Sequence, residues 1–243
     1  MGPIVSTLAF QPPVLTYNRT LSHLSFISYE EQSLSYITKY NVPIRYYNSN
    51  HRKTLLMCHG NAEDIGSANM ENLSNLFQAN ICMFDYAGYG LHTNKYASEH
   101  ACKQDVLAVY KYLTSDLLID SSNIIIYGRS LGSGPACFLA HTLCKSKIPT
   151  SLILVSPIKS ATSTVAGMWL PGDIFLNYTI APYIGCKVLV LHGDQDRVVS
   201  FGDGLGLAGM FPNFEFVTLN NRGHNDIELS EKYGENIRKF ITK

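Results

Sequence analysis

The sequence predicts an α/β fold with a mostly parallel central sheet and helices on both of its faces. Short apolar runs alternate with longer segments in which apolar residues recur at helical spacing, an order typical of parallel strands joined by helices. Polar and glycine-rich turns directly follow several of these runs, so we expect ligand-binding side chains at the carboxyl edge of the sheet. The expected strands span residues 42–47, 54–58, 81–84, 124–127, 151–156, 187–192 and 215–219.

Four longer segments between these runs read as helices. In the first, which opens at Glu63 or Asp64, apolar residues recur at helical spacing to about residue 78. The next two span about 99–114 and 131–144; Pro135 falls in the first turn of the latter, where a missing N–H is tolerated. The last spans about 226–241, and Asn225 with Glu228 three residues on resembles a capping box at its start.

Length and composition fit one globular domain. With 243 residues, of which 46% are hydrophobic and 16% charged, the chain can bury a large core, and disorder is disfavoured. We expect an N-terminal arm over residues 1–40 that packs on, or leads into, a main domain over residues 41–243. The 42–47 strand is expected at the outside of the sheet.

Charge and cysteine usage exclude several classes of function. Lys and Arg together number 19, as do Asp and Glu, and no basic block of five or more occurs, which argues against nucleic-acid binding. The six cysteines lack C-x-x-C spacing, so we expect them to be reduced in a cytoplasmic monomer. No apolar run approaches the 18 residues that a membrane-spanning helix needs, so we expect no such helix. The start, M-G-P-I-V-S, fits the loose myristoylation pattern or a short apolar arm, so peripheral membrane association stays open.

The most informative feature for function is Ser130 in the pattern G-R-S-L-G, directly behind the apolar run 124–127. Between a strand and a helix, G-x-S-x-G indicates a nucleophile elbow, a sharp turn that lifts the serine hydroxyl clear of the sheet. Asp196 follows 66 residues later and His224 a further 28. This is the order of serine, acid and histidine in alpha/beta hydrolases.

A serine hydroxyl needs a base, and that base needs an acid to fix its tautomer. We assign the base to His224, since a histidine near its reference pKa of about 6.5 can take and return a proton at neutral pH. Of two adjacent carboxylates we prefer Asp196, because Asp194 is better placed to close the turn after the strand. The expected oxyanion hole combines backbone N–H groups of Leu131 and Asn61.

Other motifs favour structural interpretations. His59 and His192, each before a glycine at a strand end, are expected to brace loops. The spacing His192-x-Asp194-x-Asp196 lacks the further ligands of a calcium or zinc site, so we predict no metal. Residues 204–209 match G-x-G-x-x-G but follow no expected strand, and we interpret them as a closely packed helix face rather than a dinucleotide site. No cofactor is predicted.

The whole chain resembles the alpha/beta hydrolase domain-containing protein 17 family of protein depalmitoylases. The resemblance is carried by H-G-N-A (59–62), D-Y-A-G-Y-G (85–90), Y-G-R-S-L-G (127–132), L-H-G-D-Q-D (191–196), G-H-N-D-I-E-L (223–229) and F-Q-P-P (10–13). It implies an alpha/beta hydrolase fold, a triad at Ser130, Asp196 and His224, and S-palmitoylated protein as the substrate. Arg129 stands where relatives usually have Gln, and no cysteine precedes Cys58, whereas animal members carry an N-terminal cysteine cluster.

The sequence therefore predicts a serine hydrolase with a minimal lid that cleaves acyl thioesters or esters. Trp169, Phe175 and Tyr178 lie in an apolar segment between two expected strands and would line an acyl site; alternatively, they roof the core. Two other functions remain open: a carboxylesterase or peptidase of the same fold, and a non-catalytic binding protein that retains the triad.

Overall fold

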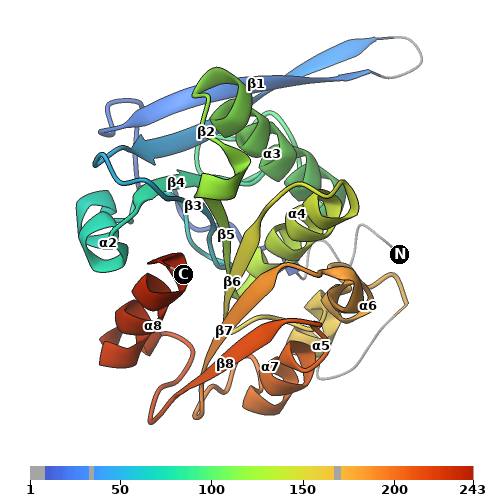
Figure 1. The fold of residues 1–243 in the computed structure, drawn as a ribbon. Coiled ribbons are helices and arrows are strands. Elements are labelled where there is room, and N and C mark those ends of the chain that lie inside the picture. The colour runs from blue at the N-terminus through green and yellow to red at the C-terminus, as the bar shows by residue number, and fades with distance from the viewer. Residues whose placement is uncertain (1–8, 33–35, 167–170, 243) are drawn as a thin grey trace.

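The computed structural model describes residues 9–32, 36–166 and 171–242, which are built around an eight-stranded sheet (Figure 1). The strand order is β1-β2-β4-β3-β5-β6-β7-β8; β1 and β2 run antiparallel to their neighbours, and β3 to β8 pair in parallel. The predicted mostly parallel sheet is therefore confirmed. Its strands are β1 (Leu24–Gln32), β2 (Ile37–Tyr47), β3 (Thr54–Cys58), β4 (Asn80–Phe84), β5 (Ile124–Arg129), β6 (Ser151–Val155), β7 (Lys187–Gly193) and β8 (Phe214–Leu219).

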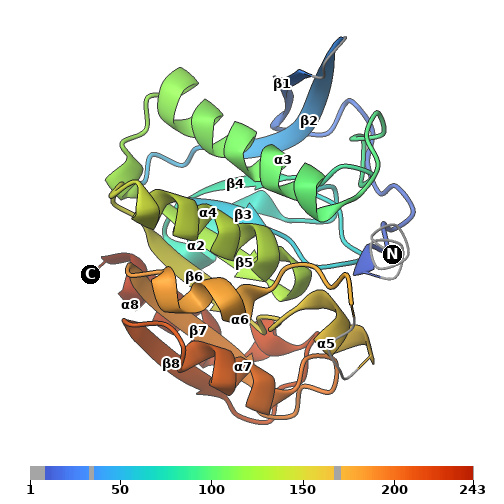
Figure 2. The same cartoon turned by 90° about the vertical axis from the view of Figure 1, so that its right-hand side faces the viewer.

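Helices cover both faces of the sheet (Figures 1 and 2). On one face lie α2 (Met70–Phe77) and α8 (Glu231–Thr242). The other face carries α3 (Glu99–Lys111), α4 (Ser133–Lys145), α5 (Ala161–Ala166), α6 (Asn177–Ile180) and α7 (Phe201–Ala208). This two-sided cover explains why the central strands are apolar throughout: in β3, Leu55 and Met57 enter one core, and Leu56 and Cys58 enter the other.

The first strand departs from the prediction. Residues 24–32 form the edge strand β1, which pairs with β2 from Leu24 opposite Arg45 to Gln32 opposite Ile37. Part of the expected N-terminal arm thus belongs to the sheet, and the boundary expected after residue 40 falls inside β2. The expectation that residues 42–47 form the outer strand is wrong, since β1 lies outside them.

Two helices begin later than predicted. The helix expected from Glu63 or Asp64 starts at Met70, with the Asn69 side chain accepting the Asn72 N–H as its N-cap. The preceding residues form turns, because Arg45 Nη1 donates to the carbonyls of Ile65 and Ala68, both at 2.7 Å, and fixes a non-helical loop.

The closing helix begins at Glu231 instead of residue 226, after a separate 3₁₀ turn at Ile227–Leu229. The predicted capping box is therefore wrong, because Asn225 lies outside the helix start. The histidine loop is held in a different way: Gly223 N–H donates to Asp226 Oδ1 at 2.6 Å.

Candidate active site

Ser130 occupies the sharp turn between β5 and a 3₁₀ turn, Ser130–Gly132, that leads into α4. Its φ of 50° lies in the left-handed region, an uncommon conformation for a residue with a side chain. Gly132 makes the turn possible: a Cβ there would lie 2.2 Å from the carbonyl oxygen of Cys58 and 2.5 Å from that of His59. The turn after Ser130 consequently packs directly on the chain that leaves β3.

The three residues predicted from the G-x-S-x-G pattern and chain order meet in one hydrogen-bonded chain. Ser130 Oγ lies 3.0 Å from His224 Nε2, and His224 Nδ1 lies 2.8 Å from Asp196 Oδ2. Since the ionised carboxylate only accepts, Nδ1 carries the proton and Nε2 accepts from the serine hydroxyl. The arrangement can therefore pass a proton from Ser130 to His224.

The Asp196 carboxylate is held from several sides. Its Oδ1 accepts the N–H groups of Val198 and Val199, each at 2.9 Å, and His192 Nε2 lies 3.3 Å from its Oδ2. Burial alone would raise the pKa of Asp196, but hydrogen bonds from His192 and His224 outweigh it and hold that pKa well below the usual range. Asp196 thus remains charged beside the imidazole.

Asp194 and His192, which precede the catalytic candidate Asp196 in sequence, have structural contacts. Asp194 Oδ1 accepts the Asn221 N–H at 2.7 Å, so this carboxylate ties the end of β7 to the turn after β8, a longer-range role than the closure of its own turn that the sequence suggested. His192 Nε2 lies 3.0 Å from the Val199 carbonyl oxygen, and its ring packs against α7, where a Cβ on Gly204 would lie 2.0 Å from Nδ1. Of the glycines in the G-x-G-x-x-G segment, Gly204 thus lies on the face of α7 that packs closely on the sheet.

Arg129, next to the serine, ties the histidine loop to the loop after β3. Its Nη2 donates to the His224 carbonyl oxygen at 3.1 Å and to Asn225 Oδ1 at 3.3 Å. Its Nη1 forms an ion pair with Glu63, whose other oxygen accepts the Gly60 N–H at 3.2 Å. Burial lowers the pKa of Arg129, but the charge of Glu63 together with the nearby Tyr127, Glu228 and Tyr233 outweighs this and raises the pKa. Sequence reasoning missed this connection.

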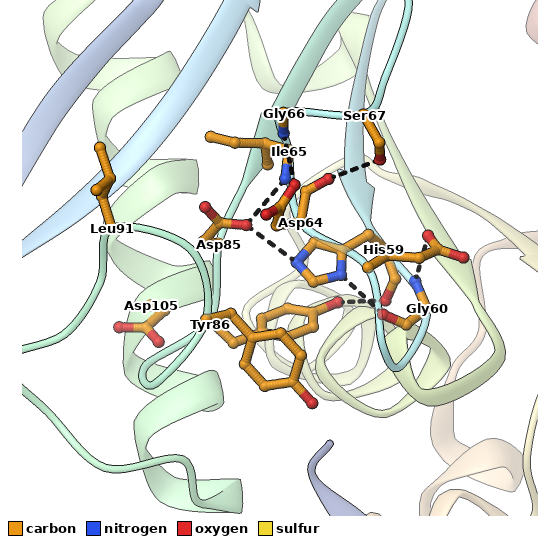
Figure 3. A network of polar contacts seen from close by, with 12 residues as sticks. His59, Gly60, Asp64, Ile65, Gly66, Ser67, Asp85, Tyr86, Leu91 and Asp105 are labelled. Carbon is orange, nitrogen blue, oxygen red and sulfur yellow. Dashed lines mark hydrogen bonds and ion pairs between the residues drawn. The ribbon is translucent and has the colours of Figure 1, made fainter. Parts of the chain in front are cut away.

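A buried polar network braces the loop that follows β3 (Figure 3). The His59 ring lies between Asp85 and Gly60, with Nε2 3.6 Å from Asp85 Oδ1 and Nδ1 2.8 Å from the Gly60 carbonyl oxygen. Tyr86 stacks on that ring at 4.2 Å and donates its hydroxyl to the His59 carbonyl oxygen at 2.7 Å. Asp85 Oδ1 also accepts the Ile65 N–H, and burial raises the pKa of Asp85. His59 therefore braces the loop, as expected.

The two predicted oxyanion-hole residues lie on the elbow and on this loop. Leu131 is buried directly after Ser130. Three hydrogen bonds hold the side chain of Asn61: Nδ2 donates to the Ala9 carbonyl oxygen at 2.8 Å, and Oδ1 accepts from Gln11 N at 2.9 Å and from Tyr89 Oη at 2.6 Å. The predicted contribution of Asn61 to the oxyanion hole is its backbone N–H, and that role stays a prediction.

The residues expected to line an acyl site differ in their positions. Phe175 is buried, with its ring 5.9 Å from that of Phe10, and it borders a cavity of about 300 Å³ together with Gly134 of α4. Tyr178 is half-buried against the core. Trp169 lies outside the described residues. The acyl-site assignment stays a prediction.

A larger cavity of about 590 Å³ lies between α2 and α8 and was not foreseen. Its floor includes Met57, Met83 and Tyr127, and its rim includes Arg129 and Asn225, the sequence neighbours of Ser130 and His224. Within the described part of the chain, no cluster of His, Cys, Asp and Glu could hold a metal ion, and no helix is long and apolar enough to cross a membrane. The six cysteines are unpaired.

Comparison with known proteins gives clear relatives. The chain is 30% identical to human alpha/beta hydrolase domain-containing protein 17B over 266 aligned positions, which cover 100% of this chain and 92% of the human protein. It is 32% identical to alpha/beta hydrolase domain-containing protein aho-3 of Caenorhabditis elegans over 77% of this chain, although it spans only 57% of that protein. No protein-family model matches.

Solved structures share the fold at low sequence identity. Esterase Pf2001 of Pyrococcus furiosus superimposes with a TM-score of 0.71 at 19% identity, covering 95% of each chain. Esterase RhEst1 of Rhodococcus sp. ECU1013 gives a TM-score of 0.67 at 16% identity, covering 91% of this chain and 99% of its own. These superpositions confirm the predicted fold class.

Proposed function

Since the chain belongs to the alpha/beta hydrolase domain-containing protein 17 family, we propose that it is a serine hydrolase that removes fatty acyl groups from S-acylated proteins. The proposal is carried by one observation: the hydrogen-bonded chain from Ser130 through His224 to Asp196, with the serine at a strained turn. The family membership supports hydrolase chemistry, and the thioester substrate is the further step that we propose.

In the proposed reaction, Ser130 Oγ attacks the acyl carbon while His224 Nε2 takes the hydroxyl proton. The carbonyl oxygen becomes an oxyanion that faces the N–H groups of Leu131 and Asn61. Collapse of this intermediate breaks the bond to sulfur, and the departing thiolate takes the proton from His224. A water molecule then repeats the two steps on the acyl-serine, which releases the fatty acid and restores the serine. Asp196 stays ionised and stabilises the imidazolium.

A thioester suits this arrangement. A cysteine thiol has a reference pKa of about 8.5, so its thiolate leaves with less help from a general acid than an alkoxide or amine needs. A long acyl chain would add binding free energy of about 0.8 kcal/mol for each buried methylene group. We place that chain beside Phe175, where the cavity next to Gly134 begins one turn after the serine.

Two measurements test the proposed function. Wild-type protein should react with a fluorophosphonate probe and Ser130→Ala should not; an unlabelled wild type would favour the non-catalytic binding protein. A panel of palmitoylated peptide, nitrophenyl esters, acyl-CoA and unmodified peptide then separates the hydrolases. We expect the highest kcat/KM on the palmitoylated peptide. A preference for short nitrophenyl esters would indicate a carboxylesterase, and cleavage of the unmodified peptide would indicate a peptidase.

The acyl-site assignment needs its own variants. Trp169→Ala should slow long-chain esters more than short-chain esters, because only a long chain would reach the segment between β6 and β7. Leu73→Trp, which fills the cavity between α2 and α8 instead, serves as the matched control and should leave chain-length preference unchanged. An equal effect of Trp169→Ala on both esters removes this assignment, and a selective effect of Leu73→Trp moves it to the other cavity.

A further inference from the structure

We propose that the N-terminal segment of residues 9–17, here called the strap, positions the Asn61 N–H for oxyanion stabilisation, an inference that rests on the proposed function. The strap precedes the first strand and crosses the loop that follows β3. Asn61 is the point of contact. The strap residues act through Asn61 and touch no reacting atom, so they are positioning residues.

Hydrogen bonds from the Asn61 side chain to the strap fix the position of Asn61. The Asn61 side chain bonds the backbone of the strap twice, donating to Ala9 O and accepting from Gln11 N. Tyr89 completes the junction, since its hydroxyl donates to Asn61 Oδ1 at 2.6 Å and accepts the Gln11 N–H at 3.0 Å. With the amide anchored in this way, the Asn61 backbone has a fixed direction.

The strap itself is anchored at both ends. Near its start, Phe10 is 6% exposed and packs edge-on against Tyr89 and Phe175, with ring centroids 6.4 and 5.9 Å away. At its other end, the Thr16 N–H donates to Asp64 Oδ2 at 2.9 Å, and the Tyr17 hydroxyl bonds Asp85. Both carboxylates belong to the network that braces the loop after β3 (Figure 3).

The middle of the strap contributes little to the hydrophobic core. Val14 is 91% exposed and Leu15 46% exposed, so these residues add almost nothing to the core. The loop that the strap contacts has an uncommon backbone conformation next to Asn61: Ala62 has a φ of 57°, and its N–H donates to Asn61 Oδ1 at 3.2 Å. An N–H displaced by about 1 Å would lose much of its value to a developing oxyanion.

Two variants loosen the strap without touching Ser130, His224 or Asp196. Tyr89→Phe removes the hydroxyl that bridges Asn61 and Gln11 and keeps the buried ring. Phe10→Ala removes the anchor at the start of the strap. Phe240→Ala is the matched control, because Phe240 is 7% exposed but lies in α8 on the other face of the sheet. Val14→Ala controls for a change within the strap that leaves its anchors intact.

Each variant is compared in the full chain by kcat and KM on nitrophenyl acetate and by the inhibition constant of a trifluoromethyl ketone, whose serine adduct carries an oxyanion. We expect kcat to fall about tenfold for Phe10→Ala and about threefold for Tyr89→Phe, with KM unchanged and the inhibition constant raised by the same factor. Both controls should keep the wild-type values, even where Phe240→Ala lowers the melting temperature as much as Phe10→Ala does.

The outcomes separate this inference from the proposed function. If wild-type protein is labelled by fluorophosphonate and hydrolyses the ester, but Tyr89→Phe and Phe10→Ala match Phe240→Ala, the strap has only a structural role and the inference is overturned. If the inhibition constant stays constant while kcat falls, the strap acts on another step and the inference also fails. Wild-type protein that is neither labelled nor active would overturn the proposed function, and the strap's role with it.

Discussion

Replacing Asp196 with Asn tests the histidine–carboxylate contact at nearly constant shape. Asn can keep one oxygen toward the N–H groups of Val198 and Val199, which leaves its NH₂ group where Oδ2 now meets His224 Nδ1 at 2.8 Å. That group is a donor, so the ring must present a lone pair at Nδ1 and carry its proton on Nε2. Nε2 then faces Ser130 Oγ as a donor and cannot take its proton.

The loss of the correct tautomer should lower kcat by about 10⁴, which corresponds to about 5.5 kcal/mol of activation free energy. The assay is turnover of nitrophenyl acetate at pH 7, normalised to the concentration of folded protein. Asp194→Asn is the matched control: its remaining oxygen can still accept the Asn221 N–H, so kcat should stay within about tenfold of wild type. An Asp196→Asn enzyme within tenfold of wild type, or a larger loss in Asp194→Asn, would refute the reasoning.

Two further predictions follow from the charged groups around the serine. Arg129→Gln removes the ion pair with Glu63 while retaining a donor for the histidine loop, so kcat should fall by about tenfold with KM unchanged; an unchanged kcat would show that the loops hold without the ion pair. The pKa of Asp196 is lower in the folded protein than in the unfolded chain, so this carboxylate stabilises the fold above about pH 4 and loses that effect on further acidification. In urea unfolding, the stability gap between wild type and Asp196→Asn should therefore narrow below about pH 4; a constant gap would contradict it.

The central sheet could be predicted because each of its strands is recognisable from its own residues. Strands β3 to β7 are buried on both faces and read as short unbroken apolar runs. Strand β1 has no such signal: apart from the buried Ile27, its residues are exposed or half-buried, with Glu30 and Glu31 near its end. Its place in the sheet depends on pairing with β2, a contact that local pattern does not encode.

The loop after β3 shows the same limit at the site. Its apolar residues have helical spacing, yet Arg45 from β2 donates hydrogen bonds to the carbonyls of Ile65 and Ala68. The strap also donates a hydrogen bond to the Asp64 side chain. Contacts from distant parts of the chain thus override a local preference that the sequence displays clearly. The Glu63–Arg129 ion pair, which joins residues 66 positions apart, was missed for the same reason.

Histidine–carboxylate contacts illustrate why position matters more than pairing. The described residues include four such buried contacts, namely His59–Asp85, His92–Asp105, His192–Asp196 and His224–Asp196. The first three histidines have side chains that are at most 1% exposed, whereas the His224 side chain is 8% exposed. Among the four, only His224 turns its second nitrogen to a hydroxyl, that of Ser130. His59 and His224 each have an adjacent glycine, which follows His59 but precedes His224, and each has an aspartate within a few residues. Local composition alone therefore could not separate a bracing pair from a proton relay. The separation came from chain order relative to the elbow, because the position of the serine dictates which histidine can reach it.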